Sequence, residues 1–129
     1  MIGYVTLGTN DLPRAAAFYD ALFGELGIKR SMEAERFIAW SASPTTPGVG
    51  VGRPYDGKPA TVGNGGMVAL IVDNTEKVRR VHARALKLGG NDEGAPGPRG
   101  EGFYAGYFRD LDGNKLNVFC MGPAASSAT

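Results

Sequence analysis

The chain has 129 residues, of which 43% are hydrophobic and 21% charged, a balance that predicts one globular domain with a buried core. Fourteen basic and thirteen acidic side chains leave a net charge of +1, which argues against a nucleic-acid partner. No apolar run approaches the ~20 residues that cross a bilayer, and the first residues lack the pattern of a secretory signal. The single cysteine, Cys120, cannot form an internal disulfide, so we expect a cytoplasmic protein without a membrane partner.

The first half of the chain predicts a strand, a helix and two further strands. The strand at Tyr4 to Leu7 ends in Asn10-Asp11, residue types that cap helices. Apolar residues then recur at helical spacing, and glycine ends the helix at Gly24 or Gly27. Two strands follow, at residues 36–40 and 48–52.

The second half repeats this order. An apolar strand over residues 67–72 ends in Asp73-Asn74, and a helical pattern runs from there to Gly89-Gly90. Strands at 102–108 and 115–120 flank an Asp-Gly turn, which predicts a hairpin with Gly113 at the tight position.

The two halves are in register with each other. Val5 matches Val68 and Leu7 matches Leu70, each at an offset of 63 residues. Several matched features at one offset indicate an internal duplication. We therefore predict a single domain, residues 1–129, with one module over about 1–58 and another over about 66–121; residues 55–65 are interpreted as a linker.

This organisation resembles the vicinal oxygen chelate superfamily of glyoxalases, bleomycin-resistance proteins and extradiol dioxygenases. The resemblance rests on residues 4–12, 14–15, 18–19, 104, 109–110 and 112–116, and residues 89–99 are similar to a bacterial glyoxalase-related subgroup. It implies an α+β fold in which two βαβββ modules form a curved mixed sheet around a half-open cavity. It also implies a homodimer.

The resemblance further implies where a metal would be held. The first-strand ligand positions fall at Tyr4 and Met67, and a final-strand carboxylate position falls at Asn117. The corresponding strand of the first module, residues 48–53, has no carboxylate. Phenol, thioether and neutral amide are poor ligands for the metals of this family, so we expect no metal and no cofactor.

Candidate ligand-binding residues are the former ligand positions and the residues near them on the strands: Tyr4, Thr6, Trp40, Met67, Tyr104 and Asn117. Other aromatic residues of the strand regions, with Arg36, Arg53 and Arg99 beside them, are further candidates, the arginines for an anionic group. His82 is interpreted as a residue of a helix face and Cys120 as a buried structural thiol, which leaves the catalytic residues unassigned.

The leading functional hypothesis is a small-molecule-binding protein of this superfamily that works without a metal. The first alternative is a glyoxalase-type lyase or related enzyme with atypical ligands. The second is a resistance protein that sequesters an antibiotic. Whether the protein is an enzyme is left open at this point.

Overall fold

The computed structural model describes residues 1–126, which form two compact units, unit 1 over Met1–Asn64 and unit 2 from Gly65 onward. Unit 1 contains β1 (Tyr4–Gly8), α1 (Leu12–Gly24), β2 (Lys29–Glu33), β3 (Phe37–Ser41) and β4 (Gly48–Gly52). Unit 2 contains β5 (Val68–Ile71), α2 (Thr75–Lys87), β6 (Asn91–Pro98), β7 (Phe103–Arg109), β8 (Lys115–Met121) and the short 3-10 helix η1 (Gly122–Ser126). The predicted α+β class with two βαβββ modules is confirmed.

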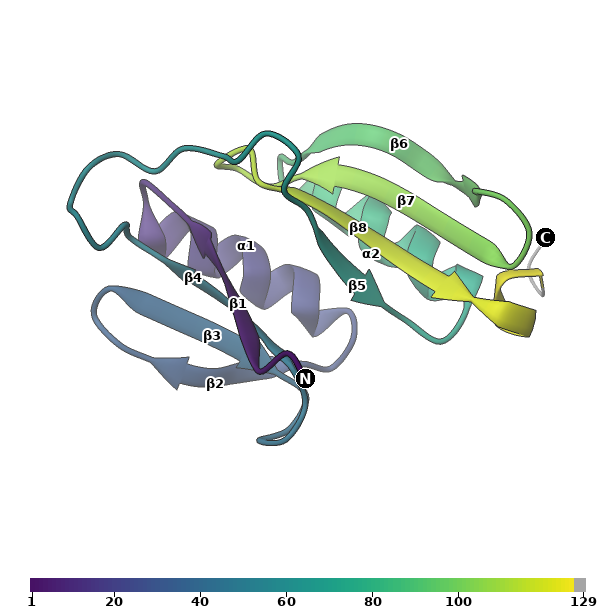
Figure 1. Ribbon diagram of the computed structural model, residues 1–129, viewed down its shortest axis with the longest axis horizontal. Helices are drawn as coiled ribbons and strands as arrows, with labels where there is room; N and C mark the ends of the chain where they lie inside the picture. The colour runs from purple at the N-terminus through teal and green to yellow at the C-terminus, as the bar shows by residue number, and fades with distance from the viewer. Residues whose placement is uncertain (127–129) are drawn as a thin grey trace. The chain divides into compact units, whose positions relative to one another are not determined.

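Each unit has a mixed four-stranded sheet, and the two sheets have the same topology (Figure 1). The strand order is β1-β4-β3-β2 in unit 1 and β5-β8-β7-β6 in unit 2. In both sheets the strand before the helix pairs in parallel with the last strand, and the other pairs are antiparallel. The internal duplication seen in the sequence therefore extends to strand pairing.

The two helices begin at equivalent caps. The Asp11 side chain accepts a hydrogen bond from the backbone N–H of Arg14 (3.1 Å), and Asn74 accepts one from Lys77 (2.8 Å). Both side chains satisfy a backbone donor that has no partner within the helix. Neither of these 13-residue helices is long and apolar enough to span a membrane.

In each unit the helix covers one face of the sheet and buries an apolar stripe there. The stripe of α1 contains Phe18, Tyr19, Leu22 and Phe23, and that of α2 contains Val78, Val81 and Ala85. Burying each of the larger side chains contributes about 1.5–3 kcal/mol to folding. The other face of each sheet is left without a helix of its own unit.

Two strands have no counterpart among those predicted from the sequence. β2 is Lys-Arg-Ser-Met-Glu and largely exposed, and β6 contains two prolines and two glycines. Both are edge strands, and each pairs through an irregular register. Edge strands tolerate polar residues and proline because one side of their backbone needs no partner in the sheet.

The predicted hairpin between β7 and β8 is present, with a longer turn than expected. Arg109 pairs with Lys115, so the turn comprises the five residues from Asp110 to Asn114. Gly113 has a φ of +90°, the left-handed conformation predicted for it. Within the turn, the Asp110 side chain accepts hydrogen bonds from the backbone N–H groups of Asp112 and Asn114.

Candidate functional site

The open face of the unit 1 sheet carries a cavity of about 910 Å³. Its apolar wall is formed by Met32, Phe37, Ala39 and Pro44. Six hydroxyl-bearing residues complete most of the lining: Tyr4, Thr6, Ser31, Ser41, Thr46 and Tyr55. None of the lining residues is charged, so the cavity offers apolar surface and neutral hydrogen-bonding groups.

Glycines of β4 create this cavity. Tyr4 lies opposite Gly48 and Thr6 opposite Gly50, so the strand between β1 and β3 presents no side chain at these points. A Cβ atom on Gly50 would overlap the ring of Phe37. The Phe37 ring therefore lies over the glycine strand and meets the ring of Tyr4 edge-on, with the centroids 6.2 Å apart.

The structure places Tyr4 and Thr6 together in this cavity, as alternation along a strand requires. Trp40 lies on the opposite face. Its ring centroid is 5.6 Å from that of Tyr19 and 5.8 Å from that of Phe23, both on α1, and the residue is only 1% exposed. Trp40 is thus a core residue beneath the helix, and it is Ala39, its neighbour, that faces the cavity.

Trp40 also belongs to a polar network that joins α1 to β2 and β3. Its Nε1–H donates to Asp20 Oδ1 (2.9 Å), and Arg30 donates to both oxygens of the same carboxylate (3.0 and 2.7 Å). The Arg30 hydrogen bonds, helped by that of Trp40, hold the pKa of Asp20 below its usual value, and the pKa of Arg30 is raised in turn. Asp20 and Arg30 therefore have a structural role.

In unit 2 the open face of the sheet carries Asn117. This residue pairs with Ala69 on one side and with Tyr107 on the other, and it is 2% exposed. Its Oδ1 atom is buried and has no hydrogen-bond partner within residues 1–126. Met67 immediately precedes β5 in the sequence. Alternation along the strand places it on the same face as Ala69, two residues later. Met67 and Asn117 therefore belong to one sheet surface.

Aromatic residues border this second surface. Phe103 and Phe119 stack with centroids 5.2 Å apart. Arg99 and Lys115 each lie over the Tyr107 ring, 5.5 and 5.6 Å from its centroid. Tyr104, a candidate from the sequence, is on the helix side. It is 8% exposed, and its hydroxyl accepts a hydrogen bond from Arg79 of α2.

His82 is on α2, as predicted, and it is buried against the helix-facing side of the sheet. Its Nε2 atom is 3.0 Å from Asp92 Oδ1 and 3.1 Å from the carbonyl oxygen of Tyr107. Both neighbours are acceptors, which places the ring proton on Nε2. Backbone donation from Gly94, together with His82, holds the pKa of Asp92 below its usual value. These bonds join α2 to β6 and β7.

Cys120 is fully buried on β8, as expected for a structural thiol. Burial raises the pKa of its thiol, and the nearby charge of Asp73 adds to the effect. A thiol with a raised pKa is a poor nucleophile at neutral pH.

The positions that the resemblance assigns to metal ligands do not form a metal site. Tyr4 offers a phenol, Met67 a thioether and Asn117 an amide oxygen, and β4 contributes only glycine and valine. No group of three or more His, Cys, Asp or Glu side chains that could hold a metal occurs in the described part of the chain. Divalent metals of the zinc and magnesium type prefer imidazole, thiolate or carboxylate ligands. The donor set therefore does not fit a metal, and no chemical step is assigned to one.

The comparisons with known proteins agree with the fold. The model of the glyoxalase/bleomycin resistance protein/dioxygenase superfamily matches residues 1–118. The chain belongs to this superfamily. No curated protein matches the sequence.

Solved structures provide closer comparisons. A glyoxalase/bleomycin resistance protein from Albidiferax ferrireducens is 35% identical, with a TM-score of 0.86 over 95% of this chain and 99% of that one. A lactoylglutathione lyase from Agrobacterium tumefaciens is 22% identical, with a TM-score of 0.69 over 93% and 92% of the two chains. The fosfomycin resistance protein FosX from Mesorhizobium loti is 19% identical, with a TM-score of 0.67 over 99% and 97%. The last two support the fold alone.

Proposed function

We propose that this protein binds a small, uncharged and partly aromatic organic molecule on the open sheet face of unit 1, without a metal ion. The observation that carries the proposal is the cavity of about 910 Å³ with its apolar wall and its six hydroxyl-bearing residues. Ligand sites in proteins have volumes of roughly 300–1,000 Å³ and combine apolar walls with a few polar groups that orient the ligand.

The chemistry of the wall favours a neutral ligand. The Tyr4 and Phe37 rings provide flat apolar surface, and the hydroxyl of Thr6 can donate or accept a hydrogen bond. An ionic group would lose its hydration here without gaining a charged partner. We therefore favour binding over a metal-dependent lyase reaction, which needs ligands that these positions lack.

The open face of unit 2, taken by itself, is a second candidate surface for a small molecule. A buried acceptor without a partner costs about 1–3 kcal/mol, so the Oδ1 atom of Asn117 would gain from a hydrogen-bond donor if this surface opened to a ligand. The neighbouring Tyr107, whose ring carries Arg99 and Lys115, borders the same surface.

Binding can be tested with N-phenyl-1-naphthylamine, a neutral aromatic compound that fluoresces more strongly in apolar surroundings. We expect a saturable rise in fluorescence with the parent protein. Thr6→Phe fills the cavity from an exposed position on β1 and should weaken binding about tenfold or more, since it blocks part of the apolar contact. Thr61→Phe adds the same bulk at an exposed position outside the cavity and serves as the matched control.

Equal binding by the parent and Thr6→Phe would contradict a site on this face. Both residues are exposed, so neither change should lower the melting temperature much. Measuring the melting temperature of each variant checks this.

For metal content, we expect no stoichiometric Zn, Ni, Mn or Fe in the purified protein by elemental analysis. The double variant Met67→His with Asn117→Asp supplies an imidazole and an isosteric carboxylate on one sheet surface, and it should gain measurable zinc affinity in calorimetry. One equivalent of metal in the parent, lost in Asn117→Ala, would contradict the metal-free proposal.

We also propose that the protein is a homodimer in the cytoplasm. Large apolar side chains are exposed on the open faces, among them Tyr4 (66%), Ile71 (67%) and Met121 (54%), and such surface is usually covered by a partner. The buried free thiol of Cys120 suits a reducing compartment. Sedimentation at micromolar concentration should give twice 13.5 kDa; a species with the mass of one chain would contradict the dimer.

A further inference from the structure

A second, smaller pocket of unit 1 has a different chemical character. It has a volume of about 210 Å³, and its lining residues include the exposed basic residues Arg36, Arg53 and Lys58, with Thr9, Asn10 and the turn around Gly57. None of its lining residues is acidic. The nearby acids Asp11 and Glu35 line a neighbouring cavity, which shares Asn10 and Arg53 with this one.

Specific hydrogen bonds form the wall of this pocket. Asn10 binds Ala60 twice: its Nδ2 donates to the Ala60 carbonyl (3.2 Å), and its Oδ1 accepts from the Ala60 N–H (2.6 Å). The backbone N–H of Arg53 donates to the carbonyl of Arg36 (3.1 Å), and Arg36 Nη2 donates to the carbonyl of Pro54 (2.9 Å). The segment that follows β4 is therefore held against the end of β1.

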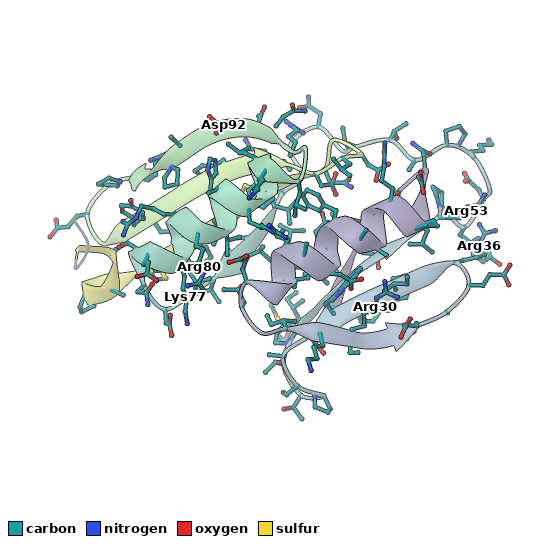
Figure 2. The ribbon with its side chains drawn as sticks, turned by 180° about the vertical axis from the view of Figure 1, so that it is seen from behind. Arg30, Arg36, Arg53, Lys77, Arg80 and Asp92 are labelled. Atoms are coloured by element: carbon teal, nitrogen blue, oxygen red, sulfur yellow. The ribbon has the colours of Figure 1, made fainter. Side chains whose placement is uncertain are left out.

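The basic residues of the pocket have no acidic partner, whereas several other cations of the protein do. Arg30 is paired with Asp20 and Glu33, Lys77 with Asp73, and Arg80 with Glu76. Across residues 1–126, by contrast, Arg36, Arg53 and Lys58 make no ion pair. Figure 2 shows Arg36 and Arg53 near each other at one end of unit 1. Asp56, the acid nearest to Lys58 along the chain, accepts a hydrogen bond from the backbone N–H of Lys58 and does not line the pocket.

We propose that this pocket binds a phosphate group, either free or at the end of a small metabolite. Three positive charges around one small space suit a doubly charged anion. Arginine guanidinium groups match phosphate oxygens with paired, charge-assisted hydrogen bonds, and lysine adds a third charge. The site is separate from the uncharged cavity of the proposed function, because the two pockets share no lining residue.

The test is a titration of the ¹⁵N-labelled full chain with sodium phosphate, with ionic strength held constant by sodium chloride. We expect saturable shifts of the amides of Asn10, Arg53, Gly57 and Lys58. Arg53→Gln should weaken phosphate binding about tenfold, which corresponds to the loss of one charge-assisted contact. Lys29→Gln removes one charge from an exposed position on β2 outside the pocket and should leave the affinity unchanged.

Two further titrations separate the possible forms of the ligand. Methyl phosphate should bind at least as well as inorganic phosphate if a metabolite is recognised through its terminal phosphate, and more weakly if free phosphate is the ligand. Either result supports the proposal. Sodium acetate should bind more weakly than both, because a carboxylate carries one charge.

Shifts that do not saturate, an equal affinity in Arg53→Gln, or acetate binding as tight as phosphate would each overturn the phosphate site. Failure here is independent of the cavity on the open face. Thr6→Phe, which blocks that cavity, should leave the phosphate shifts unchanged.

Discussion

Trp40→Ala is expected to lower the free energy of unfolding by about 3–5 kcal/mol, the range for removing a large aromatic side chain from a core. The indole is 1% exposed and packs on two rings of α1. The variant also loses the hydrogen bond from the indole to Asp20. Urea denaturation followed by circular dichroism measures the change, since the variant has no tryptophan left for fluorescence.

Trp40→Phe is the matched variant. It keeps an aromatic ring beneath α1 but loses the indole donor, and Asp20 keeps its two hydrogen bonds to Arg30. The expected loss is about 1–2 kcal/mol, for one hydrogen bond and some packing. If Trp40→Ala cost less than about 1 kcal/mol, as at an exposed position, the indole would not be in the core and would again be a candidate for the ligand cavity.

The second large effect is expected at the turn between β7 and β8. Asp110 is 3% exposed, and its Oδ1 accepts hydrogen bonds from the backbone N–H groups of Asp112 and Asn114, both at 2.9 Å. Its Oδ2 accepts a further bond from the Asn114 side chain, also at 2.9 Å. Asp110→Ala leaves these donors without their acceptor and should cost about 2–4 kcal/mol in thermal or chemical unfolding.

Asp110→Asn retains one side-chain oxygen and should lose less stability than Asp110→Ala. Gly113→Val tests the backbone of the same turn, because a β-branched residue is strained at its φ of +90°. We expect a cost of about 1–3 kcal/mol. If Asp110→Ala and Asp110→Asn had equal free energies of unfolding, the side-chain hydrogen bonds would not hold the turn. If Gly113→Val had the same free energy of unfolding as the parent, the loop would adopt another backbone conformation.

The sequence by itself was sufficient for the repeating architecture. Alternation and helical spacing are local patterns, so the strands at Tyr4 and Gly48 and the helix caps at Asp11 and Asn74 could be read from neighbouring residues. The constant offset between the halves then predicted two equivalent modules. The edge strands β2 and β6 were not predicted, because a strand with one free edge needs little apolar pattern in its sequence.

Only the tertiary structure decided which face of each strand meets a helix. Trp40 and Tyr104 are aromatic strand residues like Tyr4, yet both lie beneath a helix, because alternation separates the two faces without saying which one is covered. The Gly-Val-Gly-Val-Gly pattern of β4 was the available sign of the cavity, since one face of that strand has no side chains. The pattern could be interpreted as a cavity only after the structure placed the Phe37 ring over Gly50.

The role of residues 55–65, which the sequence predicts as a linker, also depends on the tertiary structure. Tyr55 lines the open-face cavity, Lys58 lines the basic pocket, and Ala60 is bound to Asn10 fifty residues earlier in the chain. Local sequence predicts a turn-rich connection here, as glycine and proline favour turns. Contacts between residues far apart in the sequence depend on how the chain folds back on itself, so they were decided by the tertiary structure alone.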